Sequence, residues 1–144
     1  DFTREKFEEA YNADLANGLG NLVSRVAKLC EKINFTIDES NISKPKLKKQ
    51  VTDSLDKYNF YRALVFLWNS EIKWGIRWLD QTINEEEPWK IVDQELLKLQ
   101  LFLYVTTIRD IAYNLQPFLP ETAEKILNQF SGKIKSSTPL FPRI

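Results

Sequence analysis

The amino-acid sequence predicts an all-α fold, an antiparallel bundle of about five helices followed by a non-helical carboxyl-terminal tail. The first observation is the scarcity of turn residues, with 4 glycines and 6 prolines among 144 residues. The second is an apolar fraction of 43%, which suffices for the core of one domain. The third is the recurrence of apolar residues at steps of three and four, the spacing that places side chains on one face of a helix.

The first helix is predicted over residues 7–33. Its apolar stripe comprises Leu15, Leu19, Leu22, Val26, Leu29 and Ile33. Residues 34–45 are polar and rich in serine and asparagine, which favour turns, so they indicate a surface connection. A shorter and strongly charged helix is expected over residues 45–57.

A third helix is predicted as one continuous element over residues 60–83, and it is expected to be the central, most buried helix. Its stripe comprises Phe60, Leu64, Trp68, Ile72, Ile76, Leu79 and Ile83. Trp74 and Trp78 fall on other faces, and all three tryptophans of this helix are interpreted as structural or interface residues. Pro88 predicts a break over residues 84–89, because a proline disfavours helical geometry in the residue before it.

A fourth helix is predicted over residues 92–115, before Pro117, and a fifth from Pro120 to about Gly132. Proline suits the first position of a helix, and glycine suits the residue that follows its end. The prolines of residues 136–144 predict a tail that is not helical but is apolar enough to pack on the bundle.

We expect a single domain over residues 1–144, in which residues 1–33 form the first helix, 34–135 the remaining bundle and 136–144 the tail. No apolar run approaches the roughly 20 residues that span a bilayer. The amino-terminal residues lack the apolar core of a signal peptide. The chain is therefore expected to be an interior piece of a cytoplasmic protein without a membrane partner.

The composition excludes several classes of function. Lysine plus arginine equals aspartate plus glutamate, 20 against 20, so any contact with nucleic acid requires a local basic patch. The single cysteine, Cys30, excludes an internal disulfide, and the absence of histidine removes the familiar zinc sites and histidine catalysis. Because no glycine-rich phosphate loop or convergent carboxylate pair is found, no catalytic residue, metal ligand or cofactor site is predicted in this chain.

A polar row on the first helix is the first candidate site. Its members are Asn21, Arg25, Lys28 and Lys32, one position ahead of the core stripe at steps of four and three. The row therefore lines an edge of the bundle. An amide and a guanidinium one helical turn apart can both make bidentate hydrogen bonds to the edges of unpaired bases. A solvated helix flank with salt bridges to its neighbours fits the same periodicity, so both interpretations stay open.

Trp89 is the second candidate, because Pro88 places it at a helix break rather than inside a helix. A partly exposed indole at this position can stack on an unpaired base. A tryptophan that caps the end of the core fits the sequence equally well. A basic cluster is a further candidate, either for phosphate contact or as an ordinary charged surface. Its members are Lys44, Lys46, Lys48 and Lys49.

Four segments carry a resemblance to a known family. Residues 11–25, YNADLANGLGNLVSR, resemble the opening helix of the anticodon-binding domain in class I aminoacyl-tRNA synthetases. Three further segments resemble characteristic sequences of the methionyl-tRNA synthetases: EPWK at 87–90, LQPFLPETA at 115–123 and PLFPRI at 139–144. Together they span nearly the whole chain, which is thus similar to the carboxyl-terminal anticodon-binding domain of that family.

The resemblance implies a role for individual residues. In that family, an asparagine and an arginine of the first helix and a tryptophan of the later loop recognise the CAU anticodon. The matching residues here are Asn21, Arg25 and Trp89. Pro88 is implied as the rigid neighbour that presents the tryptophan, and Arg143 as part of a tail that returns toward the catalytic domain.

The implied partners are methionine tRNA, bound through its anticodon stem-loop, and the catalytic domain of the same polypeptide. Lys28 and Lys32 are expected near the tRNA backbone. The family's catalytic signatures, HIGH and KMSKS, and its zinc-bearing insertion are absent from this sequence. The resemblance therefore implies a parent ligase that attaches methionine to its tRNA with ATP. It does not decide whether the catalytic domain of that parent binds zinc. It also predicts that this fragment alone is inactive.

Two alternative functions are compatible with a helical bundle. One is the anticodon domain of another class I synthetase, for valine, leucine, isoleucine or cysteine, which lacks this combination of loop and tail. The other is a helical protein-interaction module that docks a partner through the displaced tryptophans and predicts a large exposed apolar patch.

Two features depart from the family pattern: a short connecting region and the acidic run Glu85–Glu87, which would repel phosphates.

Overall fold

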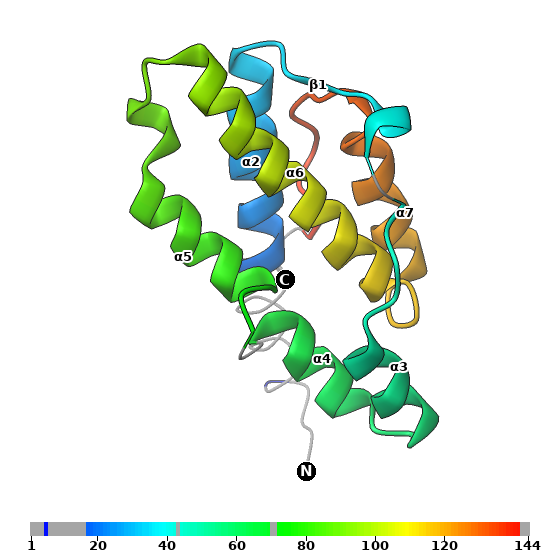
Figure 1. Ribbon diagram of the computed structural model, residues 1–144. Helices are drawn as coiled ribbons and strands as arrows, with labels where there is room; N and C mark the ends of the chain where they lie inside the picture. Colours follow the sequence, from blue (N-terminus) through cyan, green and yellow to red (C-terminus); the bar gives the residue numbers. More distant parts are fainter. Residues whose placement is uncertain (1–4, 6–16, 43, 70–71, 142–144) are drawn as a thin grey trace.

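The structure is a computed structural model that describes residues 5, 17–42, 44–69 and 72–141. Its described residues form a helical bundle with one very small antiparallel sheet (Figure 1). The helices are α2 (Asn21–Lys32), α3 (Lys49–Asp56), α4 (Phe60–Trp68), α5 (Ile76–Glu86), α6 (Gln94–Leu115) and α7 (Pro120–Gln129). The 3-10 turns are η2 (Glu39–Asn41) and η3 (Pro88–Lys90), and the strands are β1 (Thr36–Ile37) and β2 (Gly132–Lys133). The predicted all-α class is confirmed.

Helix α6 is the central element of the bundle. It is 22 residues long and packs against α2, α4, α5 and α7. Figure 1 shows it crossing the bundle with α5 on one side and α7 on the other. Leu101, Tyr104 and Leu115 of this helix are fully buried. The prediction that the helix over residues 60–83 is the most buried one was therefore wrong.

The predicted third helix is in fact two helices, α4 and α5. Gly75 has a φ of 107°, a left-handed conformation that a residue with a side chain adopts only under strain. A Cβ at this position would lie 3.0 Å from the carbonyl oxygen of Leu67. The backbone turn places Trp74 in the core, stacked on Phe66 with ring centroids 5.3 Å apart. Both halves carry the same apolar spacing, so the pattern appeared continuous across the break.

The start of α3 is also later than predicted, at Lys49 rather than residue 45. The preceding segment is extended because the buried Asn114 of α6 bonds to its backbone. Asn114 Oδ1 accepts from the Lys48 N–H at 2.6 Å, and Asn114 Nδ2 donates to the Lys46 carbonyl at 3.1 Å. A buried amide therefore determines where this helix begins, and only tertiary contact could reveal it.

The remaining helix ends lie close to their predicted positions. Helix α6 begins at Gln94, where the Asp93 side chain caps it by accepting from two backbone N–H groups. Helix α7 begins at Pro120, as predicted, but ends at Gln129. Helix α2 ends at Lys32, and the part of the predicted first helix over residues 7–16 lies outside the described residues.

Strands β1 and β2 were not predicted. They pair Thr36 with Lys133 and Ile37 with Gly132 in an antiparallel register. A strand of two residues is too short for an alternating pattern to identify it. The pairing attaches the segment that follows α7 to the connection that follows α2. The non-helical character of the tail is confirmed through residue 141.

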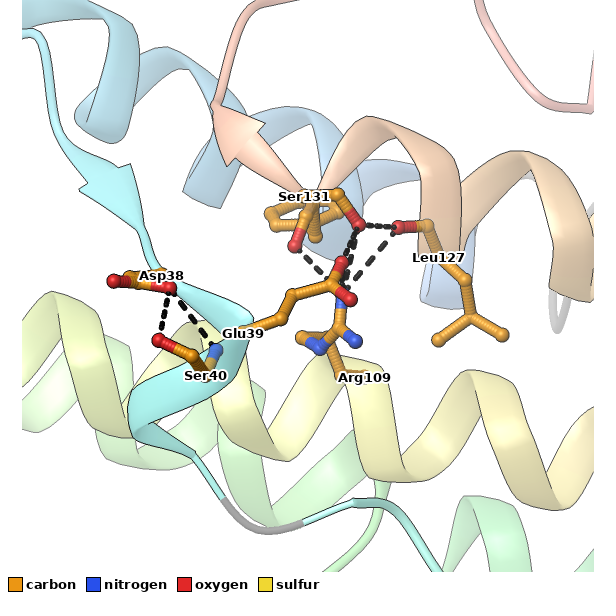
Figure 2. A network of polar contacts seen from close by, with 7 residues as sticks. Asp38, Glu39, Ser40, Arg109, Leu127 and Ser131 are labelled. Carbon is orange, nitrogen blue, oxygen red and sulfur yellow. Dashed lines mark hydrogen bonds and ion pairs between the residues drawn. The ribbon is translucent and has the colours of Figure 1, made fainter.

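Arg109 joins three elements near this small sheet (Figure 2). Its side chain is 8% exposed and lies 3.5 Å from a carboxylate oxygen of Glu39. Its Nη1 donates to the Phe130 carbonyl at 2.9 Å and to Ser131 Oγ at 3.0 Å. A guanidinium at the end of α7 satisfies carbonyls that have no helical partner. Arg109 is thus a structural residue that connects η2, α6 and α7.

Candidate nucleic-acid interface

Arg25 is held in a defined position by helix α5. Its Nη1 donates to Asp80 Oδ1 at 2.8 Å, and its Nη2 donates to Asn84 Oδ1 at 2.8 Å. Asp80 and Asn84 are one turn apart on α5, so both face the same neighbour. These two bonds orient the planar guanidinium and leave its other N–H groups available. Its side chain is 34% exposed, so those groups are accessible to a ligand.

Trp89 lies beside this guanidinium. The Cζ atom of Arg25 is 5.8 Å from the centroid of the indole ring, which is within cation–π distance. The tryptophan is 48% exposed, so of the two alternatives left open by the sequence, the partly exposed indole is the one that the structure shows. One face of a fixed aromatic ring and an oriented guanidinium thus lie next to each other at the surface.

The backbone before Trp89 explains how the indole is presented. Glu87 ends α5 in the left-handed conformation, with φ 47° and ψ 58°. Pro88 follows as the first residue of η3 and is itself buried. A proline with a fixed φ angle, anchored in the core, limits the directions in which the next side chain can point. The buried Pro88 therefore restricts where the Trp89 side chain can lie.

Asn21 lies one turn before Arg25 and is exposed at the start of α2. Residues 17–20 form a π-helical turn before it, a feature found often at functional sites. Asn21 also lines a cavity of about 280 Å³ between α2, α7 and the tail. The structure thus places Arg25 within cation–π distance of Trp89, and Asn21 lies one turn from Arg25 on the same helix.

The acidic run beside this site is largely occupied by internal partners. Glu86 accepts a hydrogen bond from the Tyr104 hydroxyl at 2.5 Å. Burial and the Glu86 carboxylate together raise the pKa of Tyr104. Glu87 forms an ion pair with Lys90 at 3.2 Å. Two of the three glutamates therefore have partners within the protein, and the Lys90 ammonium offsets the charge of one of them, Glu87.

The two groups of lysines predicted from the sequence lie in different places. Lys28 and Lys32 are exposed on α2 with Arg25. The basic cluster instead lies along α6, where Lys44, Lys46 and Lys48 line a groove with Phe102 and Asp110. Figure 1 shows this segment on the α7 side of α6, away from α5. Only Lys28 and Lys32 therefore share a helix with the candidate site.

Sequence reasoning missed Asp80 and Asn84. They were polar positions beside the apolar stripe of a helix, and their spacing of four residues was the only available signal. Their part in the site depends on α2 and α5 packing with these faces opposed. Arg143 of the predicted tail contact lies outside the described residues.

The displaced tryptophans do not form an exposed patch. Trp74 is buried, and Trp78 is partly buried against the core. Exposed apolar side chains gather instead on the outer face of α6. They are Leu96, Leu99, Phe102 and Leu103. The chain therefore has an apolar face, but not through the residues that the interaction-module hypothesis named.

A scan against protein-family models finds no match for this chain. Among curated proteins, it is similar to the methionine–tRNA ligase of Clostridium acetobutylicum, with 33% identity over 99% of this chain and 27% of the relative. It is similar to that of Flavobacterium psychrophilum, with 32% identity over 88% of this chain and 20% of the relative. The ligase of Fusobacterium nucleatum is 29% identical over 92% of this chain and 26% of the relative.

Over nearly its whole length, the chain is thus similar to one segment of methionine–tRNA ligases. It spans about a quarter of the length of the Clostridium and Fusobacterium relatives that it matches. The match to the Clostridium protein extends over 176 aligned positions, more than the 144 residues of this chain. The matching part of the Clostridium protein is therefore longer than this chain.

Among the described residues, no helix combines the length and the apolar character that crossing a membrane requires. No group of three or more potential metal-binding side chains is found in the same part of the chain.

Proposed function

We propose that this segment is the anticodon-binding domain of a methionine–tRNA ligase and that it recognises the CAU anticodon of methionine tRNA. The observation that carries the proposal is the contact between Arg25 and Trp89, in which α5 orients the guanidinium beside a half-exposed indole. The similarity to methionine–tRNA ligases supports the same function. Resemblance and geometry thus agree on the same residues.

The proposed mechanism assigns a physical role to each residue. Trp89 stacks on an unpaired base of the anticodon loop, because its ring is exposed and every base offers a flat face. Arg25 donates hydrogen bonds to base edges, and Asn21 both donates and accepts them; these edges distinguish one base from another. Lys28 and Lys32 contact the phosphate backbone, which contributes affinity without sequence preference.

The parent protein would attach methionine to its tRNA with ATP in a catalytic domain outside this segment. Zinc, if the parent binds it, would also belong to that domain. We expect the segment alone to bind tRNA without catalysing aminoacylation, and we place the parent enzyme in the cytoplasm. The catalytic domain and methionine tRNA are its proposed partners.

The test is the affinity for an RNA stem-loop with the CAU anticodon, compared with the same stem-loop carrying a changed anticodon. Trp89→Ala should weaken CAU binding by about 1–3 kcal/mol through lost stacking, roughly 5- to 150-fold. Tyr58→Ala is a matched control, because Tyr58 is 85% exposed and is not part of the proposed site. Equal losses in both variants, or no preference for CAU, would contradict the proposal.

The exposed apolar face of α6 favours one second candidate, a protein-docking function. Leu99 is 69% exposed, and contiguous exposed apolar residues commonly mark interaction surfaces. Leu99→Glu in the same stem-loop assay should leave the CAU preference intact. A loss of RNA binding in this variant would mean that the two surfaces are not separate.

A further inference from the structure

Two hollows adjoin each other behind Asn21. The first is the cavity of about 280 Å³ that Asn21 lines. The second is an open trough of about 550 Å³ on the far side of the tail. Both are lined by Gln129 of α7 and by tail residues 137–140. The hollows therefore share a wall and follow one another across the surface between α2, the tail and α7.

Their chemical character changes from one hollow to the next. The described lining of the first is uncharged and includes the amides of Asn17 and Asn21 and the hydroxyl of Ser24. The second, which we call the basic trough, is lined by Lys125, Lys133 and Lys135. No aspartate or glutamate is among the described residues that line either hollow. Neutral hydrogen-bonding groups thus adjoin a concentrated positive charge.

The backbone that carries these lysines is held in place. Lys133 pairs with Thr36 between β2 and β1. The Lys135 carbonyl accepts from Gln129 Nε2 at 3.0 Å, and the next residue donates its N–H to Glu31 at 2.7 Å. All three lysine side chains are exposed. Their backbone positions are fixed by the fold, while their ammonium groups can reach a ligand.

We infer that the basic trough is a second tRNA-binding site, which takes the phosphate backbone of the same strand whose bases are read at Asn21, Arg25 and Trp89. The inference rests on the proposed function and adds the path that the RNA strand takes beyond Asn21. Uncharged amides suit base edges, and ammonium groups suit phosphates. A strand that leaves Asn21 across the tail passes from the first kind of group to the second. The trough contributes affinity, and the Arg25 side contributes anticodon preference.

The test substitutes all three trough lysines together, as Lys125→Gln, Lys133→Gln and Lys135→Gln. Binding of the CAU and changed stem-loops is measured over a range of salt concentrations. Three lost phosphate contacts should reduce the slope of log affinity against log salt by about 2–3, equally for both RNAs. The ratio of the two affinities should stay as in the unchanged protein. A matched control carries Lys44→Gln, Lys46→Gln and Lys49→Gln, three exposed lysines outside the trough.

The outcomes separate this inference from the proposed function. If the unchanged protein prefers CAU and the trough variant keeps the full salt slope, the trough site is wrong and the anticodon proposal stands. If both triple variants lose the same slope, only net charge matters, which also overturns the trough site. If the unchanged protein shows no preference and only the trough variant loses slope, the trough is a phosphate site and the anticodon proposal fails.

Discussion

Two arginines of this protein make similar contacts in very different surroundings. Arg109 and Arg25 each lie near a carboxylate and donate hydrogen bonds to oxygen atoms on neighbouring elements. Arg109 is buried and bonds to backbone carbonyls at the end of α7. Arg25 is partly exposed, and within the described part of the chain it bonds to side chains of α5 rather than to backbone carbonyls. Figures 1 and 2 show that Arg109 joins η2 and α7 to α6, whereas α2 and α5 meet on another side of the bundle.

An arginine side chain can thus stabilise the fold at one position and be available for recognition at another. Substitution of a buried guanidinium that bonds to backbone carbonyls leaves those carbonyls without a hydrogen-bond partner. A partly exposed guanidinium contributes little to stability, because water competes for its ion pair. It keeps N–H groups free for a ligand, and two bonds from α5 fix its direction. Burial and the type of partner, rather than the presence of an ion pair, distinguish the two roles.

The largest expected effect is that of Arg109→Ala on stability. The variant leaves the Phe130 carbonyl without its partner and removes a cation from the end of α7. We expect a loss of about 2–4 kcal/mol in the free energy of unfolding, measured by urea denaturation. Arg109→Lys keeps the charge but not the forked geometry, so its loss should be smaller. The preference for the CAU stem-loop, measured where the variant is folded, should be unchanged.

An intermediate effect is expected for Arg25→Ala, on binding rather than on stability. The preference for the CAU stem-loop over a changed one should fall by about 1–3 kcal/mol, because a base contact is lost. The free energy of unfolding should fall by less than about 1 kcal/mol, because the ion pair with Asp80 is partly exposed. A loss of stability as large as that of Arg109→Ala would contradict the conclusion that exposure and partner type distinguish the two arginines.

The smallest effect concerns Asp110, the neighbour of Arg109 in sequence. Burial raises the pKa of Asp110 above its ordinary 3.8, although Lys48 and Arg109 act in the opposite direction. The folded protein therefore binds this proton more tightly than the unfolded chain, and Asp110 lowers stability as pH rises through its folded pKa. Asp110→Asn should be slightly more stable than the unchanged protein at pH 7, in urea denaturation. The gain should disappear at a pH well below 3.8, and a gain that persists there would exclude ionisation as its cause.

The comparison also shows which parts of the site are visible in a sequence. Helical spacing placed Asn21 and Arg25 on one edge of a helix, and Pro88 indicated that Trp89 lies at a break. Neither observation decided between a binding site and an ordinary surface. The resemblance to methionyl-tRNA synthetases favoured the binding site without any information on the contacts of these residues. The partners Asp80 and Asn84 could not be predicted, because nothing local indicates which two helix faces meet.

Local signals and long-range contacts also account for different features of the fold. Periodic apolar residues determined that the chain is helical, and Pro120 determined the start of α7, since both effects act within one or two turns. The break between α4 and α5 was missed because Gly75 interrupts the backbone without interrupting the spacing of apolar residues. The start of α3 depends on Asn114, which is more than sixty residues away in the chain.

From the sequence alone came the helical class, several helix ends and three candidate site residues. Those properties depend on local backbone preferences and on which side chains avoid water. Only the tertiary structure decided that Arg25 is oriented by α5 beside Trp89, that Arg109 is structural, and that β1 pairs with β2. These contacts join residues distant in the chain, and their energies depend on burial and direction, which exist only once the helices have packed.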